Sequence, residues 1–211
     1  QRMQRVDYKS EDVALFRQQV LEDLVPLASE LRAAQAKRLG LDQLMYWDEG
    51  SYDLAGNPKP RGDEAWMIQR AREMFDTMGP DIGGFFNMMA DQGYLDLDTR
   101  AGKAGGGFCT SFADYGVPFV FANFNGTKHD VEVFTHEIGH AFQNWRSRNK
   151  PIFDYIWPTY ESCEIHSMSL EFLTWPHMDL FFEEDADRFR KVHLTESLFF
   201  IPYGVAVDEF Q

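Results

Sequence analysis

The sequence predicts a mainly α-helical protein that also carries one small antiparallel β-hairpin. Two patterns indicate this fold class. Long stretches repeat apolar residues at helical spacing, and two short segments rich in Phe and Val, residues 108–112 and 117–122, flank a turn. An apolar fraction of 44% with 19 Phe residues is typical of a folded globule. Because 211 residues suffice for one domain with a sizeable core, we expect residues 1–211 to form a single domain.

The longest helix expected in the first half lies near the start of the chain. Ser10 is its expected N-cap, and the helix is expected to run to about Arg38, where Gly40 provides the stop. Pro26 removes a backbone donor inside this span, so a kink is expected there. Residues 41–62 contain several Gly and Pro residues and indicate an irregular connection.

Two shorter helices and the hairpin are expected next. The first of these helices runs from Asp63 to about Met78, and the second runs from Ile82 to Asp91. Residues 92–107 indicate a loop that ends in the glycine run 105–107. Residues 114–116 then form the turn of the hairpin. The glycine run lacks the Lys-Ser/Thr ending of a phosphate-binding loop, which leaves a flexible loop over a cleft or a plain connector.

Pro118 constrains the second strand of the hairpin. Proline cannot donate to a β-ladder, so the strand 117–122 is expected at a sheet edge, or to begin with its proline facing outward. An exposed edge could bind an extended peptide by strand addition. A covered hairpin that only braces the next helix is the alternative, and both interpretations stay open.

A buried helix of about 20 residues is predicted after the hairpin. Thr127 is its expected N-cap, with Asp130 at the third helical position. Further helices are expected to begin near Pro158 and to span residues 184–200, while residues 202–211 indicate a helix that is just starting. The helix that begins after Thr127 has apolar faces supplied by Val131, Val133, Phe134, Ile138, Ala141, Phe142 and Trp145.

The most informative segment is His136-Glu137-Ile138-Gly139-His140, inside this helix. The two histidines are four residues apart, so they lie on one helical face and can bind a single metal ion. Glu137 lies beside them, where its carboxylate could take a proton from a metal-bound water. The pattern therefore predicts a metal-dependent hydrolytic site.

A catalytic zinc site usually takes three protein ligands, so one more is needed. The helix that begins near Pro158 carries five side chains able to ligate, and spacing alone does not choose among them. They are Glu161, Cys163, Glu164, His166 and Glu171.

The two helices together resemble the M3 family of zinc metallopeptidases, in particular the bacterial oligoendopeptidase F branch. That family carries His-Glu-x-x-His, followed on a later helix by Glu-x-x-Ser and a further Glu seven residues after the first. Here this pattern falls on Glu164, Ser167 and Glu171. Residues 108–124 also resemble the family's approach to its active helix. The resemblance covers most of the chain, and residues 108–171 are its specific part.

The resemblance implies a zincin-like catalytic domain with one zinc ion bound by His136, His140 and Glu164. It also implies that Glu171 steadies a zinc ligand from behind. His166 then has a packing role or lines a substrate cleft, because Glu164 completes the ligand set. The glycine run is similar to the glycine-rich loop of the family.

The implied activity is internal cleavage of short peptides by a zinc metalloendopeptidase. Glu137 would accept the proton of a zinc-bound water and pass it to the leaving amine. A purely structural zinc is disfavoured because three ligands leave an open position, and cobalt or manganese could use the same ligands.

Family members are considerably longer, so we expect this chain to be either an internal part of a larger protein, with the remainder of that protein as a partner, or an unusually short relative. The residues that stabilise the oxyanion in the family lie downstream of this chain, and neither Tyr160 nor Tyr203 is assigned that role. The alternative is therefore a catalytically weak fragment that binds zinc and peptides.

Composition excludes other partners. A net charge of −14 argues against nucleic acid and anionic membranes, which prefer basic surfaces. No apolar run approaches 18 residues, and no signal-peptide pattern opens the chain, so a cytoplasmic protein is predicted. Cys109 and Cys163 are then expected to be free thiols.

Overall fold

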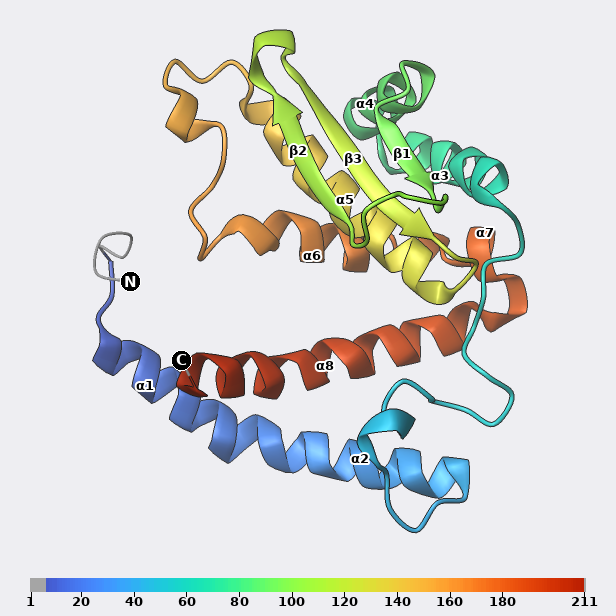
Figure 1. Ribbon diagram of the computed structural model, residues 1–211, viewed down its shortest axis with the longest axis vertical. Helices are drawn as coiled ribbons and strands as arrows, with labels where there is room; N and C mark the ends of the chain where they lie inside the picture. Colours follow the sequence, from blue (N-terminus) through green and yellow to red (C-terminus); the bar gives the residue numbers. More distant parts are fainter. Residues whose placement is uncertain (1–6, 211) are drawn as a thin grey trace. The chain divides into compact units, whose positions relative to one another are not determined.

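A computed structural model describes residues 7–210 of the chain (Figure 1). The chain divides into two compact units, one built from the residues up to 57 and from 190 onward, the other from Pro58–Phe189. The interpretation of residues 1–211 as a single domain stays a prediction, and residues 1–6 and 211 lie outside the described part. No helix in the described part is both long and apolar enough to cross a membrane.

The first unit is helical. It contains α1 (Ser10–Gln19), α2 (Val25–Leu39) and most of α8 (Ala186–Phe210). The sequence predicted a single kinked helix where the structure has α1 and α2. A π-helical turn at Val20–Leu24 joins these two helices. This turn ends two residues before Pro26, which has no N–H to bond the carbonyl of Glu22 four residues earlier. The wider turn accommodates that missing hydrogen bond.

Two helix boundaries in this unit differ from the expectation. The residue that caps α1 is Lys9, not Ser10, and Asp12 accepts its backbone N–H at 2.8 Å. Helix α8 continues through Pro202 to Phe210, whereas the sequence predicted that one helix ends near 200 and another begins at 202. A single proline removes one backbone bond, which a long helix tolerates when later residues such as Val205 are buried.

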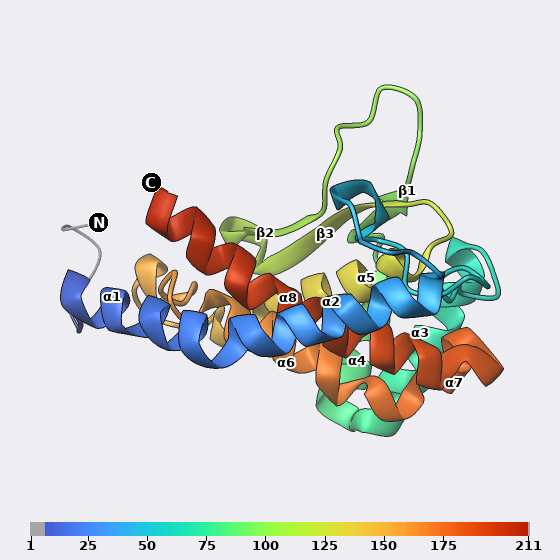
Figure 2. The same cartoon turned by 90° about the horizontal axis from the view of Figure 1, so that it is seen from below.

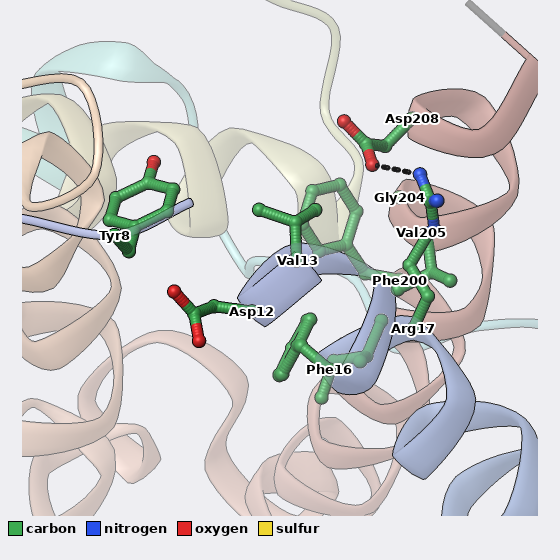
Figure 3. Close-up of a pocket in the computed structure, with 10 residues that line it drawn as sticks. Tyr8, Asp12, Val13, Phe16, Arg17, Phe200, Gly204, Val205 and Asp208 are labelled. Atoms are coloured by element: carbon green, nitrogen blue, oxygen red, sulfur yellow. Dashed lines mark hydrogen bonds and ion pairs between the residues drawn. The ribbon is translucent and has the colours of Figure 1, made fainter. Parts of the chain in front are cut away.

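The first unit also has an apolar groove of about 530 Å³ between α1 and α8 (Figure 3). Val13 and Phe16 line it from α1, and Phe200 lines it from α8. Arg17 and Asp208 join the two helices beside the groove through an ion pair of 2.8 Å.

The second unit combines a small sheet with the helices α3 (Glu64–Met78), α4 (Pro80–Asp91), α5 (Lys128–Ser147), α6 (Cys163–Leu173) and α7 (Asp179–Phe182). Helix α5 lies against the sheet and α6 packs beside α5 (Figure 1). Asp63 caps α3 by accepting the Trp66 N–H at 3.0 Å, at the place where the sequence predicted this helix to begin. Helix α6 begins five residues later than Pro158, where it was expected.

The sheet has three strands in the order β1-β3-β2, which are Leu95–Asp98, Val117–Phe124 and Phe108–Phe112. The predicted hairpin forms from β2 and β3, which are antiparallel. Strand β1 adds to it in parallel and was missed, because its four residues, LDLD, fall within a segment that reads as a loop. The fold class is confirmed as mainly helical with a small sheet.

The position of β3 corrects the expectation of an edge strand at 117–122. Strand β3 is central, and β2 forms one edge. Pro118 is tolerated because pairing with β1 begins only at Val120, whose N–H bonds the Tyr94 carbonyl. Residues two apart in a strand turn their nitrogens to the same side, so the Pro118 nitrogen faces the β1 side, as the Val120 nitrogen does. Strand β1 has not yet begun opposite Pro118, so no ladder hydrogen bond is lost there.

The core of the second unit lies between the sheet and α3, α4 and α5. Alternate residues of β3 are buried, as expected for a strand with one covered face. Phe134 of α5 meets Phe86 of α4 edge to face, with ring centroids 5.5 Å apart. Phe134 and Ile138 are both buried, and this packing fixes the rotation of α5 about its axis. The apolar face of α5 is therefore held by the core while its histidines face α6.

Candidate metal centre

Helix α5 starts where the sequence predicted, with Thr127 as its N-cap residue. The threonine side chain makes no capping hydrogen bond, and Asp130 instead binds the turn that precedes the helix. The Asp130 carboxylate accepts the backbone N–H of Asn125 at 3.0 Å and that of Gly126 at 2.7 Å. These bonds hold the Asn125-Gly126 turn just ahead of the helix, and the His-Glu-x-x-His motif lies in the middle of its 20 residues.

Three side chains converge between α5 and α6. His136 Nε2 lies 3.0 Å from Glu164 Oε2, His140 Nε2 lies 3.2 Å from the same oxygen, and the two Nε2 atoms are 3.2 Å apart. Among the described His, Cys, Asp and Glu side chains, these three form a group whose ligand atoms lie close enough together to share a metal ion. Glu161, Cys163, His166 and Glu171 were also sequence candidates, and they are not part of the group.

Glycine at position 139 permits the two helices to come this close. A Cβ atom built on Gly139 would lie 2.6 Å from Ser167 Cα and 2.7 Å from the His166 carbonyl oxygen. Both are backbone-level contacts of α6 that cannot move aside as the end of a flexible side chain could. The role of Gly139 was missed by the sequence analysis. An isolated glycine inside a strongly helical motif was the available signal.

Glu171 lies behind His136, with its Oε1 2.6 Å from the imidazole Nδ1. A carboxylate only accepts hydrogen bonds, so Nδ1–H is the donor and the lone pair of the neutral ring is on Nε2, facing the centre. Burial works against the charged form of His136, but the hydrogen bond and charge of Glu171 outweigh it, and the pKa of His136 is raised. The pKa of His140 is lowered, chiefly by burial.

Glu164 is oriented by its neighbours on α6. Ser167 Oγ donates to Glu164 Oε2 at 2.7 Å, and Cys163 Sγ lies 3.4 Å from Oε1. Burial opposes ionisation of Glu164, but the Ser167 hydrogen bond and the two histidines prevail, and the pKa of this carboxyl is lowered. Glu164 is thus held as an anion aimed at the histidines, and the donor set of two imidazoles and one carboxylate fits a divalent transition metal.

Glu137 is buried, with 7% of its surface exposed, on the side of α5 that faces the start of β2. Burial raises its pKa to about 7; His136 opposes the shift and the charge of Glu164 adds to it. The Cys109 backbone N–H donates to its carboxylate. Burial, with the charge of Glu137, also raises the pKa of the Cys109 thiol to about 12, so this thiol is unreactive as a nucleophile. Cys109 and Cys163 are both free thiols.

Comparison with known proteins extends the likeness beyond the motif. The family model for peptidase family M3 matches residues 74–199, more than half of the chain. A crystal structure of a candidate oligoendopeptidase F from Bacillus anthracis strain Ames is 52% identical, with a TM-score of 0.97. A structure of PZ peptidase A with an inhibitor is 50% identical, with a TM-score of 0.95. No curated protein matches the chain.

The chain spans only part of these relatives. It is covered completely by the Bacillus anthracis structure but accounts for 39% of that protein's length. The corresponding figures for PZ peptidase A are 98% and 37%.

Proposed function

The chain belongs to peptidase family M3, and from that premise we propose that it carries the catalytic centre of a zinc metalloendopeptidase that cleaves short peptides internally. The observation that carries this proposal is the convergence of two imidazole nitrogens and one carboxylate oxygen beside a buried glutamate. Such a set leaves an open coordination position, which favours a catalytic metal over a structural one.

We assign His136, His140 and Glu164 as the zinc ligands, with Glu171 holding the His136 ring in place. A zinc ion held there would polarise the scissile carbonyl and lower the pKa of water in the site. Neutral Nε2 atoms and an ionised carboxylate are the protonation states that metal ligation requires. The Glu171 hydrogen bond fixes the His136 tautomer that turns Nε2 toward the centre, and the Ser167 hydrogen bond favours the ionised form of Glu164 before any ion arrives.

Glu137 is the proposed general base. A pKa near 7 is well placed for accepting a proton from the attacking water and returning it to the leaving amine. Its burial keeps competing solvent away, and the Cys109 N–H orients the carboxylate. Proton transfer by such a positioned group contributes about 10²–10⁴-fold to rate.

We propose β2 as the docking strand for the peptide. Among the described residues, β2 pairs with β3 on one side and forms the edge of the sheet on the other. An extended peptide that adds to this edge would pass next to Glu137, because the Cys109 N–H of β2 contacts that carboxylate. Strand addition at 117–122 was one of two interpretations left open by the sequence, and this proposal places it at 108–112 instead.

The alternative is a catalytically weak unit that binds zinc and peptides. Coverage of 39% of a relative's length motivates it, because groups that stabilise the oxyanion can lie in the rest of such a protein. Both versions fit a cytoplasmic protein with free thiols, and both predict metal binding. They differ in turnover.

One experiment separates them. Metal content and cleavage of a quenched fluorescent peptide are measured for the parent and for Glu137→Gln, which keeps the shape of the side chain but cannot act as a base. We expect equal zinc in both proteins and a loss of at least about 10²-fold in kcat for the variant. Equal cleavage by the two proteins would contradict the mechanism. A parent that binds zinc without cleaving would favour the binding unit.

A further inference from the structure

The loop between β1 and β2 carries a buried lysine that the proposed mechanism does not use. Figure 2 shows this connection, residues 99–107, as the loop that stands out from the sheet. Lys103 lies on it, yet only 2% of its side chain is exposed. A lysine is seldom buried to this extent unless its ammonium is fully paired.

The ammonium of Lys103 is enclosed by oxygen atoms from both neighbouring strands. Nζ donates to the carbonyl oxygens of Asp96 at 3.0 Å, Asp98 at 2.7 Å and Ala122 at 2.6 Å, and it also lies 3.0 Å from the Asp96 carboxylate. It further lies 4.5 Å from the centre of the Phe121 ring. The β1–β3 register shifts between Asp96 and Asp98, and Lys103 supplies donors to carbonyls at that irregularity.

Asn123 of β3 provides a second anchor, and it binds the loop one and three residues after Lys103. Its side-chain amide donates to the Ala104 carbonyl at 2.9 Å and to the Gly106 carbonyl at 2.8 Å. Phe108, where β2 begins, stacks on Phe121 with ring centroids 4.8 Å apart. The loop is therefore tied to β3 at each stage between Lys103 and the start of β2.

The anchored segment ends against the proposed base. A Cβ atom built on Gly107 would lie 2.9 Å from Val133 Cγ1 and 3.8 Å from Glu137 Oε1, so the backbone passes close to α5. Two residues later, the Cys109 N–H donates to the Glu137 carboxylate. Any shift of this segment would therefore move the Cys109 N–H away from the Glu137 carboxylate.

We propose that Lys103 is a positioning residue for the peptidase reaction, because its buried ammonium fixes residues 104–109 against Glu137. This inference rests on the proposed function. It gives that reaction a further residue, one that contacts neither the metal ligands nor the substrate. Arg100 offers a matched comparison. It lies on the same loop and also pairs with Asp96, at 2.5 and 2.8 Å, but its side chain is 57% exposed and both of these bonds go to the Asp96 carboxylate rather than to a strand carbonyl.

The test compares Lys103→Met with Arg100→Met by amide hydrogen exchange, zinc content and peptide cleavage. For Lys103→Met we expect exchange at the Cys109 amide to accelerate at least about 10-fold, with the rest of residues 58–189 unchanged. We also expect kcat to fall about 10-fold while KM changes less than about threefold and zinc content stays constant. Arg100→Met should match the parent in all of these.

Three results would overturn the proposal. They are unchanged exchange at residues 104–109, faster exchange throughout residues 58–189, and local release without loss of kcat. If Lys103→Met does not fold, Asn123→Ala takes its place, because it frees the same segment without emptying the buried site. Asn123→Ala with parental exchange and kcat would also overturn it. Exchange is measured whether or not peptides are cleaved, so a parent without cleavage contradicts the proposed function separately.

Discussion

At the residue scale, Glu171 decides which nitrogen of His136 faces the metal centre. The 2.6 Å contact keeps the proton on Nδ1 and leaves Nε2 available. We expect Glu171→Gln to weaken zinc binding by about 10–100-fold, because an uncharged amide neither fixes the tautomer as firmly nor raises ligand basicity. Competition with a chelator of known affinity measures this. An affinity equal to that of the parent would show that Glu171 is only a neighbour of the histidine.

A second carboxyl, Glu64 at the start of α3, makes stability depend on pH. Burial, followed by the hydrogen bond and charge of Asp98, raises its pKa from 4.5 to about 7. Between these values the folded protein holds a proton that the unfolded chain releases. The stabilising contribution is therefore complete below pH 4.5 and is lost as the pH rises through about 7.

Glu64→Gln should remove this dependence while retaining a donor for Asp98. We expect the variant to exceed the parent in unfolding free energy by about 1 kcal/mol at pH 8, a value reduced by the partial exposure of the group. At pH 4 the parent should have no such deficit. Urea unfolding at both pH values provides the comparison, and a difference that is the same at pH 4 and pH 8 would rule out titration of Glu64 as its cause.

At the element scale, the approach of α5 to α6 builds the candidate site, and Gly139 sets that distance. Gly139→Ala would place a methyl group 2.6 Å from Ser167 Cα, so the helices must separate and carry Glu164 away from the histidines. We expect a loss of about 1–3 kcal/mol in stability and at least about 10-fold in zinc affinity.

Gly84→Ala is the matched control for that substitution. It also changes a glycine inside a helix, α4, but a Cβ atom there meets nothing within 4 Å. Alanine should therefore stabilise the protein by about 0.5–1 kcal/mol through its helix propensity. Calorimetric unfolding and zinc titration of both variants test the contrast, and an equal effect of the two substitutions would remove Gly139 from the account.

Elements with strong local signals could be predicted from the sequence. Helix α5 was predicted at its observed position because a turn, an acidic residue at Asp130 and a long apolar periodicity agree with one another. Strand β1 was not, because four residues that alternate Leu and Asp gain their strand conformation from β3 rather than from their own preference. The end of α8 was misjudged for a related reason, since helical context outweighed Pro202.

The candidate site divides in the same way. His136, Glu137 and His140 are local to one helix, so their spacing alone indicates a metal site. Glu164 was selected through resemblance, because no rule of spacing separates it from Glu161, three residues earlier in the sequence. Contacts between distant segments, such as Lys103 with the strand carbonyls, depend on the tertiary fold and have no sequence signature.

At the scale of the whole molecule, the proposed chemistry is concentrated in the unit formed by Pro58–Phe189. All three proposed zinc ligands and the base lie in it, and so does the loop anchored by Lys103. The relatives have more than twice the length of this chain, so how much turnover this chain achieves by itself is a separate question from whether it binds metal. Metal binding is the claim on which the function depends.

The most direct measurement of that claim is the zinc stoichiometry and affinity of the parent, Glu164→Ala and Glu161→Ala. Glu161 is the matched control, since it lies three residues earlier, just ahead of α6, and was an equal candidate by residue type. We expect about one zinc per chain for the parent and for Glu161→Ala, and an affinity at least about 10²-fold lower for Glu164→Ala. Zinc lost from Glu161→Ala and retained by Glu164→Ala would contradict it.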